Sequence, residues 1–293
     1  MTVGPGPAPG TGSLSRMPEA DLRNLRRPIV IVAFAGWSDA AQAASDAVDH
    51  LVTTYHATVA VTLDPSDYYD FQVTRPVTSL TTDGQRTITW PSTEILVCPL
   101  PQRDVVVVRG PEPNFHWPAY AAALVASMLI VEPELVIALG ALLGENPHTR
   151  PIPVSLSSSD PEVRRHYDAE QSTYEGPTGI QGVVAQACQV AGLATVSLWA
   201  ACSHYVANPP NPKATLALLS RLEDLLGQPI DLGDLPARAE LWEKNVNDLA
   251  NEDPDVAEYI HSLEVASDAR PVEPSGDAIA AEFQRYLRRQ NES

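Results

Sequence analysis

Runs of apolar, mostly β-branched residues constrain the fold of this chain more than any other feature. PIVIVAF (28–34) and ELVIALG (134–140) contain almost no polar residue. A strand that is wet on one face alternates apolar and polar residues, so these continuous runs predict strands buried on both faces of a sheet. Further strands are expected at TVAVTL (58–63), TEILVCPL (93–100), DVVVVRG (104–110) and LATVSLWAA (193–201).

Helices are expected between these strands. The chain opens with a strand, a helix over about Asp39–Tyr55 and another strand, which is the repeating unit of a parallel sheet. A helix at 117–131 is nearly all apolar and is therefore expected to be sandwiched rather than half exposed. A short polar helix is expected at 160–171, and Asp83-Gly84 between alternating runs predicts a hairpin. The pattern indicates an α/β fold with a mostly parallel mixed sheet.

Composition divides the chain into three parts. Residues 1–24, with the stretch GPGPAPGTGS, are expected to be a disordered leader, and Met17 is an alternative start. Residues 25–230 contain every strand signal and are expected to form the α/β domain. Residues 231–293 carry 15 acidic and 6 basic residues and are expected to be an acidic helical extension. Its helices are expected at 236–250, 255–266 and 276–289.

Charge and cysteine content narrow the function classes. The 293 residues carry a net charge of −18, which repels nucleic acid and anionic membranes, so neither is expected as a partner. The longest apolar run, Pro118–Val131, is shorter than the roughly 20 residues that span a bilayer, and no signal peptide is recognisable. Cys98, Cys188 and Cys202 form no C-x-x-C pair, so we expect reduced core cysteines and a cytoplasmic protein.

Loops that follow the predicted strands are the expected position of a binding site. In an open parallel sheet, ligands bind beyond the carboxyl ends of the strands. Here those loops are GWSDA (36–40), RGPEPNFHW (109–117), GALLGENPHTRP (140–151) and CSHYVANPPNPK (202–213). Together with the glycine-rich stretch YEGPTGIQG (174–182), they form a candidate rim for a ligand or a partner. Its candidate residues are Trp37, Ser38, Asp39, Glu112, His116, Glu145, His148, Arg150, Tyr174, Gly176, Gly179, His204 and Tyr205.

The stretch GWSDA has a catalytic and a structural interpretation. It lies between a strand and a helix and is close to the G-x-S-x-G nucleophile elbow, with His148 or His204 as the base. However, alanine replaces the last glycine, and the stretch follows the first strand rather than a central one. We favour the alternative, in which Ser38 or Asp39 caps the helix.

Metal and phosphate motifs are weaker still. No H-x-x-H, H-E-x-x-H or C-x-x-C occurs, and His116, His148 and His204 would meet only if three loops converged, so we expect no metal and no cofactor. EGPTGIQG lacks the G-K-[ST] ending of a P-loop, and its glycines, at 176, 179 and 182, are evenly spaced by three, which does not match G-x-G-x-x-G. Thr178 and Gln181 instead match a capping box. The helix start behind the loop also suits an anion, but we favour close packing.

Several stretches, taken together, resemble a known family. FAGWSDAAQAASDAV, VVVVRGPEPNFHWPAY, IALGALLGENPHTRP, YEGPTGIQGVV and CSHYVANPPNPKATLALLSRLEDLLG are similar to the proteasome assembly chaperone 2 family, in its actinobacterial branch, over about residues 28–266. The resemblance implies a three-layer α/β/α fold similar to nucleoside phosphorylases and peptidyl-tRNA hydrolases. It also implies a helical C-terminal extension and homo-oligomers, trimers among them. In eukaryotes the namesake scaffolds the ring of proteasome α-subunits with a second chaperone, and no catalytic residue set is established for the family.

The resemblance favours a non-enzymatic interaction or assembly protein with a protein partner. The chain ends RRQNES, without the hydrophobic-tyrosine-any-residue tail of many proteasome-docking proteins, so we expect a surface-mediated role rather than tail insertion. Two alternatives remain open. One is a phosphorylase- or hydrolase-like enzyme that uses the rim, and the other is a small-ligand sensor whose pocket binds without reacting.

Overall fold

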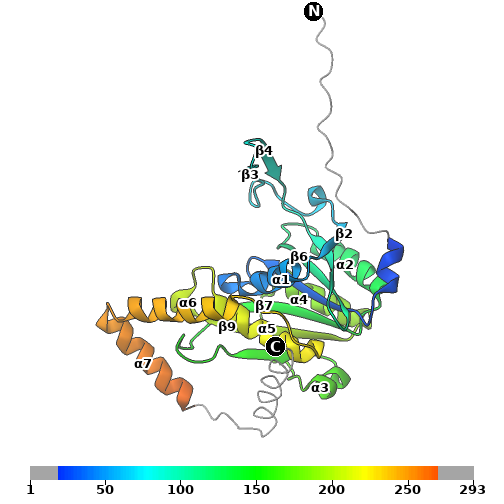
Figure 1. Cartoon of the computed structure of the whole chain (residues 1–293). Coiled ribbons are helices and arrows are strands. Elements are labelled where there is room, and N and C mark those ends of the chain that lie inside the picture. Colours follow the sequence, from blue (N-terminus) through cyan, green and yellow to red (C-terminus); the bar gives the residue numbers. More distant parts are fainter. Residues whose placement is uncertain (1–18, 270–293) are drawn as a thin grey trace, which may run out of the picture.

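A seven-stranded sheet forms the centre of the molecule in the computed structural model, which describes residues 19–269 (Figure 1). The strand order is β2-β5-β6-β1-β7-β9-β8. The four strands β6, β1, β7 and β9 are parallel, whereas β5 is antiparallel to β2 and β6, and β8 is antiparallel to β9. The predicted mostly parallel mixed sheet is confirmed. The strands are β1 (Ile29–Ala35), β2 (Thr58–Thr62), β5 (Glu94–Pro99), β6 (Asp104–Pro111), β7 (Leu135–Gly144), β8 (Val154–Ser157) and β9 (Thr195–Ser203).

Helices cover both faces of this sheet, which gives the three-layer arrangement. Helices α1 (Ala43–Thr54) and α5 (Pro212–Leu226) share one core with Ile29 and Ile31 of β1. Helices α2 (Trp117–Val131) and α4 (Ile180–Val190) share the other core with Val30 and Val32. Alternate side chains of one strand thus enter opposite cores, which is why the sequence shows no polar alternation there.

Helix α2 differs from its expectation. It was expected to be sandwiched, but only one side of it packs on the sheet, through Tyr120, Leu124 and Met128. Leu129 on the opposite side is 48% exposed. The exposed positions also include Ala122 and Ala126, and alanine costs little in water and favours the helix by its propensity. The apolar composition of α2 therefore reflects the helix propensity of its alanines as well as the burial of its larger side chains.

The N-terminal boundary of the domain also differs from the prediction. Residues 1–18 of the expected disordered leader lie outside the described part, but Glu19–Asn24 form a short 3-10 helix. Leu22 is only 1% exposed and joins the core beneath α2. The structured part of the chain therefore begins earlier than its composition predicted, because the burial of Leu22 in the core holds this polar segment in place. Strand β8 was also not predicted, because it has only four residues and two of them are polar.

The predicted hairpin is present and projects away from the body (Figure 1). Strands β3 (Val77–Leu80) and β4 (Arg86–Thr89) form a separate two-stranded sheet, and every residue of both strands is exposed. Gly84 in the turn has a φ of 80°, which a residue with a side chain rarely adopts.

Two of the three expected extension helices are observed. Helix α6 (Leu235–Ala250) packs on α5, and its Leu235 enters the main core, so the extension starts as part of the domain. Helix α7 (Pro254–Asp268) turns back beneath it (Figure 1). The third helix, expected at 276–289, lies outside the described residues. A short polar helix, α3 (Pro161–Tyr167), also matches its prediction.

The three cysteines are free and buried, as expected. Burial raises the pKa of the Cys98, Cys188 and Cys202 thiols to about 12. They stay protonated at neutral pH and are poor nucleophiles.

The burial of Leu22 gives a test of the domain boundary. We expect Leu22→Ala to lower the free energy of unfolding by about 2–4 kcal/mol, because it removes buried methyl groups and leaves a cavity. Urea unfolding of this variant and of the exposed control Arg23→Ala measures the effect. A change below about 0.5 kcal/mol for Leu22→Ala, equal to the control, would show that this segment does not contribute to the core.

Candidate functional site

The loops that were predicted to form a rim lie along one edge of the sheet. Strands β1, β6, β7 and β9 are parallel, so the loops after them lie at the same edge. The Ser38 carbonyl accepts a hydrogen bond from the Ala141 N–H at 2.8 Å, which joins the loop after β1 to β7. The His204 Nδ1 lies 3.3 Å from the Gly144 carbonyl oxygen, which joins β7 to the turn after β9. Along this edge the candidate residues form two groups with different environments.

The first group surrounds the start of α4 and includes Trp37, Ser38, Glu112, Tyr174 and Gly179; we call it the α4 entrance. Glu112 Oε1 accepts the Ile180 N–H at 2.8 Å and so binds the first turn of α4 from the loop after β6. A β-carbon on Gly179 would collide with Ser38 Oγ and lie 3.1 Å from the Trp37 ring. Close packing, the interpretation we favoured for the glycine loop, is confirmed at Gly179.

The capping-box prediction is wrong. Thr178 Oγ1 makes only a 3.4 Å contact with the Gly179 carbonyl oxygen, and Gln181 Nε2 donates to the Ala138 carbonyl of β7. Gly179 is the N-cap residue and offers no side chain. Glu112, 68 residues away in the sequence, does the capping instead, and its carboxylate sits where an anion would bind at a helix N-terminus.

Asp39 has the structural role that we favoured. Its Oδ1 accepts the N–H groups of Ala44 and Ser45 at 2.8 and 3.2 Å, and its Oδ2 accepts the Ser45 hydroxyl. Burial raises the pKa of Asp39 despite these hydrogen bonds. Asp39 therefore stabilises the first turn of α1.

Ser38 lacks the surroundings of a nucleophile. Its Oγ is buried and has no hydrogen-bond partner among the described residues. A serine nucleophile needs a base within hydrogen-bond distance, and His148 and His204, the two bases considered, bond elsewhere.

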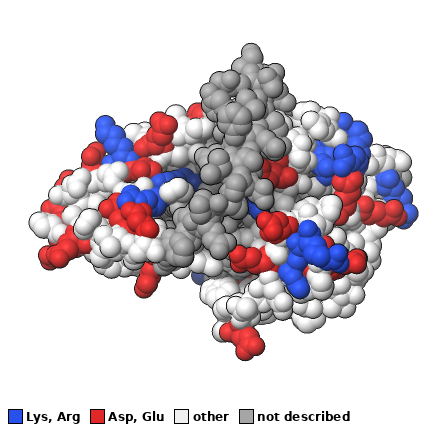
Figure 2. Space-filling model, turned by 90° about the horizontal axis from the view of Figure 1, so that it is seen from below, with Lys and Arg blue, Asp and Glu red and all other residues white. Residues whose placement is uncertain are grey.

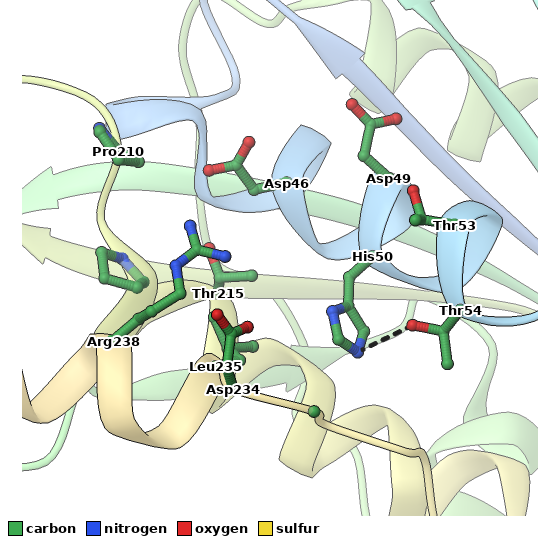
Figure 3. Close-up of a pocket in the computed structure, with 12 residues that line it drawn as sticks. Asp46, Asp49, His50, Thr53, Thr54, Pro210, Thr215, Asp234, Leu235 and Arg238 are labelled. Carbon is green, nitrogen blue, oxygen red and sulfur yellow. Dashed lines mark hydrogen bonds between the residues drawn. The ribbon is translucent and has the colours of Figure 1, made fainter.

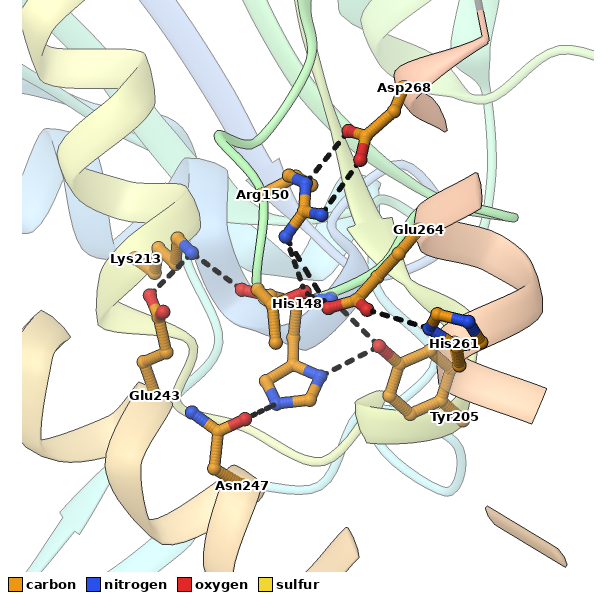
Figure 4. A network of polar contacts seen from close by, with 10 residues as sticks. His148, Arg150, Tyr205, Lys213, Glu243, Asn247, His261, Glu264 and Asp268 are labelled. Carbon is orange, nitrogen blue, oxygen red and sulfur yellow. Dashed lines mark hydrogen bonds and ion pairs between the residues drawn. The ribbon is translucent and has the colours of Figure 1, made fainter. Parts of the chain in front are cut away.

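The second group centres on His148, which is completely buried (Figure 4). Its Nε2 lies 3.1 Å from Asn247 Oδ1, and its Nδ1 lies 2.8 Å from the Tyr205 hydroxyl. The same hydroxyl accepts the His148 backbone N–H at 2.7 Å. This pattern fits a neutral imidazole that donates from Nε2 and accepts at Nδ1. Burial lowers the pKa of His148, which also favours the neutral ring.

Charged neighbours bind the same loop to the C-terminal extension (Figure 4). Lys213 Nζ donates to the His148 carbonyl and to Glu243 of α6, both at 2.5 Å. Arg150 makes a bidentate ion pair with Asp268 of α7, and both N–O distances are 2.9 Å. The hydrogen bond from Arg150 lowers the pKa of the Asp268 carboxyl. These contacts hold α6 and α7 against the loop after β7.

The candidates outside the two groups, His116, Glu145, Gly176 and His204, do not gather into one centre, although some of them contact Tyr174 or Tyr205 of those groups. His204 and Tyr205 stack edge-on with Tyr259 of α7, whereas His116 starts α2 beside Phe115. Glu145 is exposed, and Tyr174 folds over Gly176 to donate to the Pro177 carbonyl at 2.8 Å. Within residues 19–269, no three His, Cys, Asp or Glu side chains come together as metal ligands.

Sequence reasoning missed a hollow of about 480 Å³ between α1 and α6 (Figure 3). Asp46, Asp49 and His50 line it from α1, and Asp234 and Arg238 line it from α6. The spacing of Asp46, Asp49 and His50 could have indicated one polar helix face, but nothing in the sequence identified α6 as the facing element. His50 Nε2 lies 2.7 Å from the Asp231 carbonyl oxygen.

The residues that line this hollow include no Ser, Cys or Lys that could act as a nucleophile beside its acidic side chains. Asp49 is bound to Arg109 at 2.6 Å, and burial raises the pKa of Asp46.

Figure 2 shows a further face on which Lys and Arg side chains lie beside Asp and Glu side chains. None of the helices in the described part is both long enough and apolar enough to cross a bilayer.

Comparison with known proteins gives consistent relatives. The family model described as PAC2 family matches residues 33–250. A PAC2 family protein from Streptomyces avermitilis is 51% identical, with a TM-score of 0.75, over 79% of this chain and 99% of that one. A proteasome-assembly chaperone homologue from Mycobacterium tuberculosis is 45% identical, with a TM-score of 0.72 and the same coverage of both chains.

More distant structures share the fold. An archaeal proteasome activator from Pyrococcus furiosus is 18% identical, with a TM-score of 0.60, over 77% of this chain and 94% of that chain. The search of curated proteins gave no match.

The burial of neutral His148 predicts a pH dependence of stability. The folded-state pKa of His148 lies below its unfolded value of about 6.5, so its contribution is present above that pH and is lost as the pH falls through the folded-state pKa. We expect the free energy of unfolding to fall from pH 7.5 to pH 5 more steeply in the wild type than in His148→Gln. Urea titrations at both pH values measure this difference. Equal slopes would show that His148 accepts a proton without cost in the folded state.

Proposed function

The chain belongs to the PAC2 family, and from that premise we propose that it is a non-enzymatic assembly protein that binds a protein partner through the rim of its sheet. The relatives support this proposal. The Mycobacterium tuberculosis protein at 45% identity is described as a proteasome-assembly chaperone homologue. A component of the proteasome is therefore the partner we propose to test first.

One structural observation carries the proposal: the buried titratable groups His148 and Asp39 are engaged within the fold, while large apolar side chains of the rim face solvent. His148 is hydrogen-bonded to Asn247 of the C-terminal extension, and Asp39 is hydrogen-bonded to the first turn of α1. Trp37 is 63% exposed and Tyr174 is 65% exposed. Phe115, Leu142 and Leu143 are exposed at the same edge. Aromatic residues of this kind dominate the energetics of protein interfaces, whereas a catalytic centre needs available acids and bases.

We further propose that the chain forms homo-oligomers, with trimers as the first state to test, through the β3–β4 hairpin. A two-stranded hairpin alone in water is marginally stable at best. Leu80 and Ile88 lie on one side of the ribbon by strand alternation and are 68% and 59% exposed. A second copy that covers this side would bury it.

The remaining expectations belong to the same proposal. A net charge of −18 disfavours nucleic acid as a partner, and it suits a protein of the cytoplasm that meets other proteins. We propose no cofactor, because the partner is held by surface contacts alone.

Replacement of the exposed aromatics tests the partner surface. We expect Trp37→Ala with Tyr174→Ala to weaken binding to purified proteasome α-subunits of the same organism at least tenfold, since such residues cost about 2 kcal/mol or more each at an interface. Titration by native mass spectrometry measures the binding. Val190→Ala, at a residue 79% exposed on α4, is the matched control and is expected to bind normally. Equal binding by all three proteins would refute the rim as the interface, and no binding by the wild type would refute the proposed partner.

The hairpin is tested separately by its oligomeric state. We expect Leu80→Ser with Ile88→Ser to shift the protein from oligomer to monomer in sedimentation-velocity runs, because the change removes the apolar side of the ribbon. Val77→Ser, on the opposite side, is the control. A wild type that is monomeric at micromolar concentration, or an oligomer unaffected by the double change, would contradict the assignment.

A further inference from the structure

The α4 entrance combines exposed aromatic rings with acidic side chains. Trp37 is 63% exposed and rests against Gly179, and Tyr174 is 65% exposed on the same loop. Three segments form this surface, residues 34–42, 110–119 and 170–182. They contain no Lys or Arg, and beside the buried Asp39 they contain Glu112, Glu170 and Glu175.

Glu112 is the fixed acid of this surface. Its Oε1 is held at 2.8 Å by the Ile180 N–H, and its Oε2 makes no hydrogen bond within residues 19–269. Glu175, next to Tyr174, is exposed. An incoming anion would meet Glu112 already bound at the helix N-terminus, so this surface does not suit a carboxylate or a phosphate. A cation suits both the acids and the ring faces.

The geometry favours arginine over lysine. A guanidinium is planar, so it can stack on the exposed face of Trp37 while its N–H groups point at a carboxylate. The lysine ammonium is a compact, strongly hydrated charge that gains less from such stacking. An exposed ion pair by itself contributes little binding free energy. Selectivity for arginine over lysine therefore has to come from stacking on the aromatic ring.

We propose that the α4 entrance receives an arginine side chain of a partner protein, stacked on Trp37 and hydrogen-bonded to Glu112. This inference rests on the proposed function, because it states the chemistry of the partner that the rim would bind. Charge complementarity supports it: the three segments that form the surface lack Lys and Arg, and the whole chain carries a charge of −18.

The test compares two peptides of equal charge, so that general attraction to an acidic protein cancels. Fluorescein-labelled hexa-arginine and hexa-lysine are titrated into the full chain at about 0.15 M salt, where screening weakens non-specific attraction. We expect the wild type to bind hexa-arginine about three- to tenfold more tightly than hexa-lysine. Trp37→Ala is expected to bring this ratio close to one, Trp37→Phe to keep part of it, and Glu112→Gln to reduce it.

Matched variants locate the effect. Glu258→Gln removes an exposed acid on α7 and is expected to keep the wild-type ratio. Circular dichroism confirms that each variant is folded, and Glu112→Gln retains an oxygen that can accept the Ile180 N–H. A wild-type ratio near one, or a ratio that survives Trp37→Ala, would overturn the proposal.

A further variant distinguishes the partner from the chain's own C-terminal segment. Arg285, Arg288 and Arg289 lie outside the described residues and offer the same chemistry. Replacement of all three by alanine is expected to leave the affinity for hexa-arginine unchanged. A gain of threefold or more would assign the surface to the chain's own segment and overturn the proposal of a partner. If the wild type binds proteasome subunits but shows no preference for arginine, this inference fails while the proposed function stands.

Discussion

The burial of β1 on both faces is the constraint on which the rest of the structure depends. Ile29 and Ile31 enter the core of α1 and α5, and Val30 and Val32 enter the core of α2 and α4. A strand buried in this way has to have helices on both sides, and parallel neighbours have to be reached by crossover connections. Those connections collect the loops after β1, β6, β7 and β9 at one edge. The rim is therefore a consequence of how the core is covered.

Polar residues of the rim serve mainly to hold distant segments in place. Glu112 fixes the start of α4, Asp39 fixes the start of α1, and His148 with Arg150 fixes the C-terminal helices. The contacts of Glu112, His148 and Arg150 join segments that are far apart in the sequence, whereas Asp39 binds the adjacent helix start. Large apolar and aromatic side chains face solvent beside exposed acids such as Glu145 and Glu175, which is a composition that suits an interaction surface.

Membership of the PAC2 family and the geometry of the rim point in the same direction. The relatives at 45% and 51% identity are matched over 99% of their own length and over 79% of this chain. A rigid sheet that presents loops along one edge suits a protein that holds a partner in a defined orientation. The arginine site proposed at the α4 entrance would add a chemical preference to that surface, and the contact proposed for the hairpin would join a second copy at a separate point.

The sequence by itself determined the six runs that became strands of the central sheet, the hairpin at Asp83-Gly84, most helices and the edge at which the rim forms. It could do so because hydrophobic periodicity and turn residues are local signals. Only the tertiary structure decided that Glu112 rather than Thr178 caps α4, that His148 is buried against Asn247, that Leu22 enters the core and that α2 keeps one exposed side. Each of these depends on which distant segment faces the residue, and that choice is made by packing of the whole chain, which no local pattern encodes.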